Sequence, residues 1–424
     1  MQPLRGTKDI LPNETIFWQH IYNKAFKILS LSNYHEIRTP ILETTTLFKR
    51  SIGNGTDIVN KEMYSFIDQG ERQITLRPEG TASIARAFIS NKLYVDQQVK
   101  RMWYIGPMFR YERPQSGRQR QFHQLGIECI GSMSPMADAE VIRLAISILR
   151  SLQCPEYQIE INSIGNIVER NEYKEALINY LSKYYNDLDN NDKHKLSTNA
   201  LKILDSKNQQ TQKILDHAPV LTYYLGYKSK AHFNKVCEYL NDMQIEYHIN
   251  HKLVRGLDYY NDTAFEIKTQ LLGSQDTICG GGRYDTLIKQ LGGPDTPSVG
   301  WAMGIERLLL LINKIISIDI NKPIIYLATE GMQAQKNIWK IINILEEEEI
   351  SFELDLNHKS FQKQLKKANK SGAQACFILG DNEVKDNSLT VKWMQTGLQE
   401  TINLSSLPNL LQEIQAKKLD KVVL

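Results

Sequence analysis

The last hundred residues carry the pattern that most constrains the fold of this chain. Three short apolar runs alternate there with two stretches of helical periodicity, in the order 324–329, 334–348, 352–356, 359–370 and 375–380. Strands and helices that alternate at these lengths are typical of a small α/β domain with a largely parallel sheet. We therefore predict a separate domain over residues 321–424.

The first 320 residues are organised differently. A helix with one apolar stripe is predicted over 13–31, with Asn13 as its N-cap. β-type runs surround one predicted helix at 82–89, and short β-type runs with glycine turns return over 253–311. Between them, residues 167–248 are rich in polar residues and tyrosine and poor in glycine. We predict an α+β domain over residues 1–320 that carries a helical insertion at about 167–248.

Composition and cysteine spacing exclude several classes of protein. The 424 residues are 42% hydrophobic and 23% charged, and the net charge of +3 is too small to indicate a nucleic-acid partner by itself. The chain has no apolar run near the roughly 20 residues of a membrane span and no signal-peptide core at its start. Its five cysteines form no C-x-x-C pair. We expect a cytoplasmic protein with reduced thiols, no structural zinc and no membrane association.

A predicted β-hairpin is the first segment that suggests chemistry. One strand ends at Arg110, the loop beyond it is rich in arginine, and a second strand carries Gln124 and Glu128. These two side chains share one face because residues two apart on a strand point the same way. Arginine side chains beside them suit a phosphate or a carboxylate. A solvated basic hairpin would explain the arginines equally well.

Two further segments place polar residues near predicted element ends. Glu79 lies just before a predicted helix, where its carboxylate could accept a substrate ammonium group, although it could simply start the helix. Residues 253–260 combine Arg255 with a glycine, an acid and the pair Tyr259 and Tyr260. That combination favours a polar site, and its alternative is an aromatic strand with a capping arginine.

Glycines mark the last two segments. Three glycines precede Arg283 and Tyr284 and permit a close approach of the backbone to a ligand or a strand. The segment fits neither a P-loop nor a dinucleotide-binding fingerprint. Further on, a glycine-containing strand leads into an apolar helix with Arg307 in its first turns. That arginine could reach a phosphate, or it could pair with Glu306 or another helix neighbour.

Taken in order, these segments resemble the class II aminoacyl-tRNA synthetases and, within that class, the histidyl-tRNA synthetases. Residues 38–43, 108–114 and 304–307 resemble class motifs 1, 2 and 3, and residues 5–9 are similar to the family's N-terminal signature. Residues 253–260 and 279–285 match two segments peculiar to the histidine enzymes. The resemblance covers essentially the whole chain, and the class I signatures are absent from it.

The resemblance implies a fold, a reaction and partners. It implies an antiparallel sheet flanked by helices in a catalytic core over 1–320, and an anticodon-binding domain over 321–424. The implied reaction is the ATP-dependent ligation of L-histidine to tRNA(His) through a histidyl-adenylate, with release of AMP and diphosphate. Mg²⁺ is expected on the phosphates, which would mainly hold it, and no protein ligand for a metal is named. A homodimer is expected from motif 1.

The resemblance also assigns roles to individual residues. Arg110 would hold the α-phosphate of ATP, Arg307 the γ-phosphate, and Arg255 would bridge the α-phosphate and the histidine carboxylate, with Glu112 also at the nucleotide. The histidine pocket would comprise Glu79, Gly80, Thr81, Gln124, Glu128, Tyr259, Tyr260 and Tyr284. Within it, Glu128 and Tyr260 would bind the two ring nitrogens, and Glu79, Thr81 and Gln124 the ammonium group. The tRNA acceptor end would meet a loop with Arg113, Gln115, Arg118 and Arg120.

Three rival functions and one ambiguous helix remain at this stage. The rivals are a non-catalytic relative that keeps the fold, a synthetase for another amino acid, and a plain tRNA-binding protein. On the C-terminal domain, lysines recur at helical spacing at Lys359, Lys363, Lys366, Lys367 and Lys370. A solvated lysine face on an amphipathic helix explains them as well as contact with tRNA does.

Overall fold

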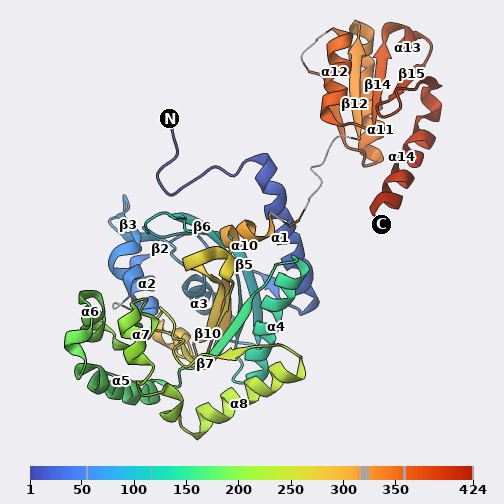
Figure 1. The fold of residues 1–424 in the computed structure, drawn as a ribbon. Helices are drawn as coiled ribbons and strands as arrows, with labels where there is room; N and C mark the ends of the chain where they lie inside the picture. The colour runs from blue at the N-terminus through green and yellow to red at the C-terminus, as the bar shows by residue number, and fades with distance from the viewer. Residues whose placement is uncertain (54–55, 116, 314, 317–323, 357–359, 423–424) are drawn as a thin grey trace. The chain divides into compact units, whose positions relative to one another are not determined.

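The computed structural model describes residues 1–53, 56–115, 117–313, 315–316, 324–356 and 360–422. The chain divides into two compact units, Met1–Ile318 and Asp319–Leu424, which are coloured blue to orange and orange to red in Figure 1. No described helix is long and apolar enough to cross a membrane.

An eight-stranded sheet forms the centre of the first unit. Its order is β1 (His35–Glu36), β5 (Lys100–Phe109), β6 (Gln121–Ile130), β11 (Ser298–Gly304), β10 (Thr277–Arg283), β9 (Asn261–Lys268), β7 (Gln158–Ser163) and β8 (His248–Ile249). The strands from β5 to β7 pair antiparallel, and the short outer strands β1 and β8 pair parallel to their neighbours. The predicted antiparallel sheet flanked by helices is therefore confirmed.

Alternating side chains give this sheet two buried faces. Trp103, Phe265 and Trp301 point to one face, where α1 (Pro12–Leu31), α4 (Pro135–Ser151) and α8 (Tyr227–Asp242) cover them. Tyr104 and Tyr284 point to the other face. There they meet α3 (Thr81–Ser90) and the insertion helices α5 (Ile167–Ser182), α6 (Asn190–Thr198) and α7 (Gln209–Leu215), drawn together in green in Figure 1.

Two sequence predictions about this unit are wrong in detail. The first helix begins at Pro12 and its N-cap is Leu11, not Asn13. Proline suits the first helical position because its fixed φ is already helical and its missing N–H would have no partner there. Residues 253–260, for which an aromatic strand was one alternative, form turns and bends, and β9 begins only at Asn261.

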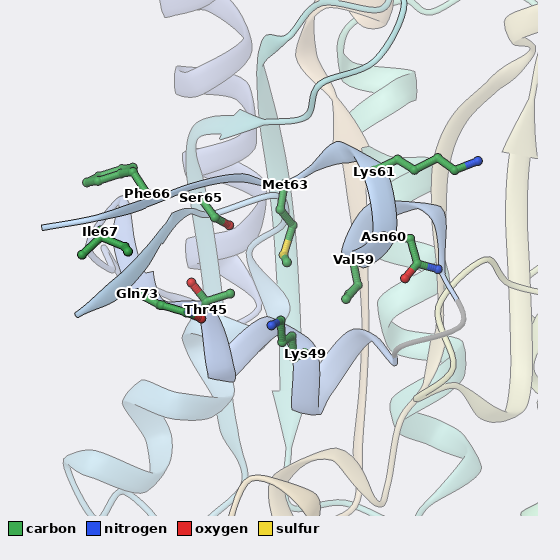
Figure 2. A pocket seen from close by; sticks show the side chains of 10 residues that line it. All are labelled: Thr45, Lys49, Val59, Asn60, Lys61, Met63, Ser65, Phe66, Ile67 and Gln73. Atoms are coloured by element: carbon green, nitrogen blue, oxygen red, sulfur yellow. The ribbon is translucent and has the colours of Figure 1, made fainter. Parts of the chain in front are cut away.

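A small second sheet packs beside α2 (Thr45–Ile52). Its antiparallel strands are β2 (Leu42–Thr44), β4 (Gln73–Leu76) and β3 (Tyr64–Ile67). Pro40 separates two strands, because β1 ends before that proline and β2 begins after it. A cavity of about 370 Å³ lies between α2 and this sheet, with Phe66 and Ile67 at one end and Asn60 and Lys61 at the other (Figure 2).

The second unit contains a mixed five-stranded sheet. Its order is β13 (Phe352–Leu354), β12 (Ile325–Glu330), β14 (Ala375–Gly380), β15 (Ser388–Trp393) and β16 (Gln399–Asn403). The first three strands are parallel, as predicted, but β14, β15 and β16 pair antiparallel, so the expectation of a largely parallel sheet is wrong. The helices are α11 (Met332–Glu347), α12 (Phe361–Ser371), α13 (Asp381–Lys385) and α14 (Leu407–Val422). Lys359, predicted on α12, lies outside the described residues.

Candidate active site

A polar cleft of about 440 Å³ opens over the middle of the eight-stranded sheet. Gly280, Ala302 and Gly304, from β10 and β11, belong to its lining and leave room above the strands. The glycine at 280 is needed for space: a Cβ atom there would lie 2.5 Å from the Arg255 guanidinium. Small residues on the central strands therefore create the hollow that the polar side chains surround.

Three arginines that are far apart in the sequence line this cleft together. Arg110 follows β5, donates from Nε to the Pro78 carbonyl at 2.9 Å and lies 5.2 Å from the Phe122 ring centroid. Arg307 stands in the first turn of α10 (Ile305–Ile312) and donates to the Thr277 carbonyl at 2.5 Å. Burial lowers the pKa of Arg307, and the nearby Arg118 guanidinium lowers it further. Guanidinium groups gathered in one cleft are suited to bind the oxygens of a phosphate or a carboxylate.

The third arginine, Arg255, stands just before β9. It forms an ion pair with Glu266, and its guanidinium carbon lies 5.4 Å from the Tyr260 ring centroid. Glu266 also lies 3.3 Å from the Lys268 ammonium. The Arg255 Nε atom is buried without a hydrogen-bond partner among the described residues. Arg255 therefore has a fixed position and one donor still available to a ligand.

Two carboxylates fix the loop side of the cleft. Glu112 lies 3.0 Å from Arg118 and 3.8 Å from Arg110. Glu306, beside Arg307, accepts from the His123 backbone N–H at 3.0 Å and lies 2.9 Å from the His123 Nδ1 atom. The partner of the Glu306 carboxylate is thus His123 of β6. The alternative in which Glu306 pairs with Arg307 is not what the structure shows.

Glu79 occupies the start of α3 at the edge of the cleft. Its carboxylate accepts from the backbone N–H groups of Ala82 at 2.8 Å and Thr81 at 3.2 Å, and from the Tyr259 hydroxyl at 3.2 Å. Burial raises its pKa, which those donors and Arg110 oppose. Glu79 therefore accepts from the first N–H groups of the helix and also lines the cleft, and its role toward an ammonium group stays a prediction.

Glu128 lies deeper, behind the wall of the cleft, and is only 1% exposed. One of its carboxylate oxygens accepts from the Thr81 hydroxyl at 2.7 Å, and the other accepts from the Tyr284 hydroxyl. Burial raises the pKa of Glu128 to about 8, although both hydroxyls favour the ionised form. A carboxylate in this setting gains from any further N–H donor that reaches it.

Gln124 lies on the same strand as Glu128 and lines the cleft directly. Its side-chain oxygen is buried and has no hydrogen-bond partner among the described residues. Such an acceptor is costly to leave unpaired, by about 1–3 kcal/mol. Gln124 therefore presents an acceptor that suits a charged donor from a ligand.

Tyrosines form the back wall. The ring centroids of Tyr259 and Tyr260 are 4.7 Å apart, and those of Tyr259 and Tyr284 are 5.7 Å apart. Tyr259 and Tyr260 line the cleft, whereas Tyr284 and Gly80 stand behind it. A Cβ atom at position 80 would fall 2.3 Å from the Tyr104 ring, so Gly80 is needed to admit that ring.

The four residues predicted to contact tRNA, in the loop between β5 and β6, lie in three different environments. Arg118 lines the cleft, while Arg113 and Gln115 are exposed to solvent. Arg120 is turned inward: its guanidinium carbon lies 3.8 Å from the Tyr111 ring centroid, and its backbone N–H donates to the Gly6 carbonyl at 2.7 Å. Arg113 and Gln115 are thus the exposed members of this set.

Sequence reasoning missed several lining residues. Glu266 and Lys268 come from β9, and Asp205 and Lys207 come from the insertion. Glu266 had a detectable signal, because it alternates with the buried Phe265 and Ile267 in a strand that is otherwise apolar there. The two insertion residues stand in a polar stretch where no local pattern distinguishes them.

The sequence and the fold of this chain are similar to those of known proteins. A sequence model of the family described as Histidyl-tRNA synthetase matches residues 6–308, and one described as Anticodon binding domain matches residues 322–414. A chloroplastic histidine–tRNA ligase of Gracilaria tenuistipitata var. liui is 63% identical, over 98% of each chain. A histidine–tRNA ligase of Acaryochloris marina is 51% identical, over 98% of this chain and 97% of its own. The crystal structure of apo histidyl-tRNA synthetase from S. aureus is 37% identical, covers 97% of this chain and 99% of its own, and has a TM-score of 0.81.

Proposed function

Because this chain belongs to the histidyl-tRNA synthetase family, we propose that its polar cleft is where ATP and histidine react. The protein is an enzyme that ligates L-histidine to tRNA(His) through a histidyl-adenylate, with ATP as substrate and AMP and diphosphate as products. One observation supports the assignment of the cleft most strongly: Arg110, Arg255 and Arg307 line it together with Glu79 and Gln124.

In the first step the histidine carboxylate attacks the α-phosphate of ATP and diphosphate leaves. Negative charge builds up on the phosphate oxygens, and cations that are already in position stabilise it without reorganisation. We assign Arg110 and Arg255 to the α-phosphate, Arg255 also to the histidine carboxylate, and Arg307 to the γ-phosphate. Glu112 belongs to the nucleotide site because it lies within ion-pair distance of Arg110 and Arg118. The 3′-terminal ribose hydroxyl of the tRNA then attacks the adenylate carbonyl.

Histidine selection rests on acceptors placed for its N–H groups. We assign the ammonium group to Glu79, Thr81 and Gln124, and one ring N–H to Glu128. Tyr260 is assigned to the other ring nitrogen, and Tyr259 and Tyr284 to the walls. A buried polar pocket of this kind rejects analogues that lack a partner by about 10⁴ or more, because its own groups would be left unpaired.

Magnesium is proposed as a companion of ATP. Mg²⁺ usually keeps several waters and binds phosphate oxygens together with one or two carboxylates. Among the described residues no three His, Cys, Asp or Glu side chains are grouped for a metal. We propose that the phosphates supply most of the ion's ligands, and we assign no protein ligand to it.

Binding of tRNA is proposed to involve both units. Arg113, Gln115, Arg118 and Arg120 of the loop between β5 and β6 are assigned to the acceptor end, where phosphates attract cations regardless of sequence. The second unit, over about 321–424, is assigned to the anticodon, and residues 1–320 to catalysis. On α12, Lys367 pairs with Asp355 at 3.1 Å, so the binding role is given to the unit and not to each lysine.

A homodimer is proposed through the small second sheet. Phe66 and Ile67, neighbours on β3 beside the cavity in Figure 2, are 46% and 69% exposed, and Leu42, on the other outer strand β2, is 51% exposed. Contiguous exposed apolar side chains mark association surfaces. Sedimentation of the Phe66→Glu variant should show a monomer where the parent protein is a dimer; a monomeric parent would contradict the proposal.

The proposed compartment is one that is reducing and carries out protein synthesis. All five cysteines are free, in agreement with such an environment. The relatives named above include the chloroplastic enzyme of Gracilaria tenuistipitata var. liui and the enzyme of Acaryochloris marina. A cytoplasm or a plastid stroma is therefore the proposed location.

One assay tests the proposed site and separates the rival functions. Purified protein should exchange pyrophosphate into ATP only when histidine is present. A non-catalytic relative or a plain tRNA-binding protein would give no exchange, and a synthetase for another amino acid would require that amino acid instead. Loss of exchange on changing Arg110 or Arg307 to alanine would support the cleft, whereas full activity in both variants would reject it.

A further inference from the structure

A buried cluster of charged residues lies under the histidine pocket, on the opposite face of the sheet. Its centre is Arg283, the last residue of β10, which is 0% exposed. The Arg283 guanidinium donates to Asp138 at 2.5 Å, to Asp285 at 3.2 Å and to the Ser132 carbonyl. Asp138, in the first turn of α4, is also 0% exposed. None of these residues lines the cleft.

The cluster is connected to the pocket through the next residue of the chain. Tyr284 follows Arg283 directly, and its hydroxyl donates to Glu128. Neighbouring residues of an extended chain point to opposite faces, so Arg283 faces α4 while Tyr284 faces Glu128. The pairing of β10 with β9 shifts in register between Gly282 and Arg283, a bulge that sets the direction of both side chains.

Asp285 anchors the other side of Tyr284. Its backbone N–H donates to the Asn261 side chain at 2.7 Å, and its carboxylate accepts from the Ser298 N–H at 2.9 Å. The Tyr284 N–H donates to the Ser298 carbonyl at 2.9 Å. Tyr284 therefore stands between two charged neighbours that are each tied to other strands or helices.

Stability alone is a weak explanation for such a cluster. Removing charges from water is costly, and well-packed apolar residues of similar volume are often as stabilising as a buried ion pair. A buried pair does restrict geometry, because each guanidinium N–H has only one well-oriented acceptor. The insertion also reaches the cluster: His232, on α8, lies 3.3 Å from the Asp138 carboxylate.

We propose that Arg283 and Asp138 are positioning residues for histidine recognition, and that they act by fixing Tyr284 and, through it, the Glu128 carboxylate. They touch neither substrate. The inference rests on the proposed assignment of Glu128 to the histidine ring. It predicts that a change in the cluster weakens the use of histidine and leaves the use of ATP intact.

The test measures Michaelis constants in pyrophosphate exchange for Asp138→Asn and Arg283→Lys, two variants that retain approximate side-chain size. Each should raise KM for histidine about tenfold or more and leave KM for ATP within about twofold. Asp355→Asn is the matched control, because Asp355 is also a buried acid, paired with Lys367 in the other unit. It should leave both constants unchanged.

Two further variants separate positioning from general damage. If Asp138 acts through Tyr284, then Asp138→Asn should have little additional effect in a Tyr284→Phe background, whereas independent effects would add. Additive effects overturn the proposal. An unchanged KM for histidine in a folded Arg283→Lys variant also overturns the proposal. This variant provides the test if Asp138→Asn fails to fold. Glu128→Gln distinguishes failure of this inference from failure of the proposed histidine pocket. If Glu128→Gln leaves KM for histidine unchanged, the assignment of Glu128 to the histidine ring is wrong.

Discussion

At the scale of single residues, Arg255 is held in a fixed position in the cleft, and we proposed that it binds the α-phosphate. Its side chain is 16% exposed, pairs with Glu266 and is seated above Gly280. A cation held in this way needs little rearrangement when charge develops on the α-phosphate. Arg255→Ala should therefore lower adenylate formation about 10²–10³-fold, measured as histidine-dependent pyrophosphate exchange. Arg72→Ala is the control, since Arg72 is an exposed arginine paired with Asp68; exchange by Arg255→Ala within about tenfold of the parent would reject the role.

Glu128 is the residue that should distinguish histidine from ATP. An N–H donor from bound histidine favours the ionised form of Glu128, and a hydrogen bond to that charged acceptor contributes about 1.5–3 kcal/mol, so Glu128→Gln should raise KM for histidine about 10–100-fold. The KM for ATP should change little, because Glu128 bonds to Thr81 and Tyr284 and to none of the arginines assigned to the phosphates. Glu140→Gln, which alters a carboxylate paired with Arg101 outside the cleft, serves as control. Equal changes in both constants would contradict the assignment.

Glu128 also predicts a pH dependence of stability. Burial raises the pKa of Glu128 to about 8 from its ordinary value of 4.5. Between these values the folded protein holds a proton that the unfolded chain has released, so stability falls as pH rises through this window. The free energy of unfolding should drop by about 3–5 kcal/mol more in the parent than in Glu128→Gln between pH 4.5 and 8. Denaturant titrations at several pH values measure this difference, and parallel curves would refute it.

At the scale of elements, the β5–β6 loop contributes side chains to the cleft and presents others to solvent. Arg118 is held at the cleft by Glu112, whereas Arg113 is exposed and does not line the cleft. Arg113→Ala should raise KM for tRNA about 3–10-fold and lower the slope of its salt dependence by about one. Pyrophosphate exchange without tRNA should not change. Arg150→Ala, at an exposed position at the end of α4, is the matched control. An equal rise of KM for tRNA in this variant would show that Arg113 acts only through the net charge of the protein.

Elements with a strong apolar period were predictable, and polar ones were not. The strand predicted over 375–380 is β14, and the helix predicted over 82–89 lies within α3. By contrast, β16 has only one half-buried residue among exposed ones, so its hairpin with β15 had no hydrophobic signal. The start of α1 was misplaced because a capping side chain was sought where Pro12 already supplies the helical φ.

At the scale of the whole molecule, the order of the motifs predicted a shared cleft better than any single motif did. Each of the segments around Arg110, Arg255 and Arg307 had a plausible structural explanation alone, and only the fold brings them to one cleft. Lys207 and Asp205 escaped prediction because their place depends on how the insertion packs, which local sequence does not encode. The depth of Glu128 behind Thr81 was likewise hidden, since strand alternation gives a face and not a depth.

The two units are expected to have separate functions. Each has its own buried core, around Trp103, Trp301 and Phe265 in the first and around Phe377, Leu327 and Leu411 in the second. A unit with its own core can fold alone. Deleting residues from about 321 onward should therefore leave pyrophosphate exchange within about threefold of the parent, because all lining residues of the cleft precede that point.

Charging of tRNA should suffer far more from the same deletion. If the second unit reads the anticodon, its loss removes much of the binding surface, and KM for tRNA should rise about 100-fold or more. Thermal unfolding of the shortened protein establishes that the first unit is folded. Equal losses in exchange and in charging would assign residues 321–424 to folding or to subunit association instead. Pyrophosphate exchange proceeds without tRNA, so the loss of an anticodon-binding domain should not alter it.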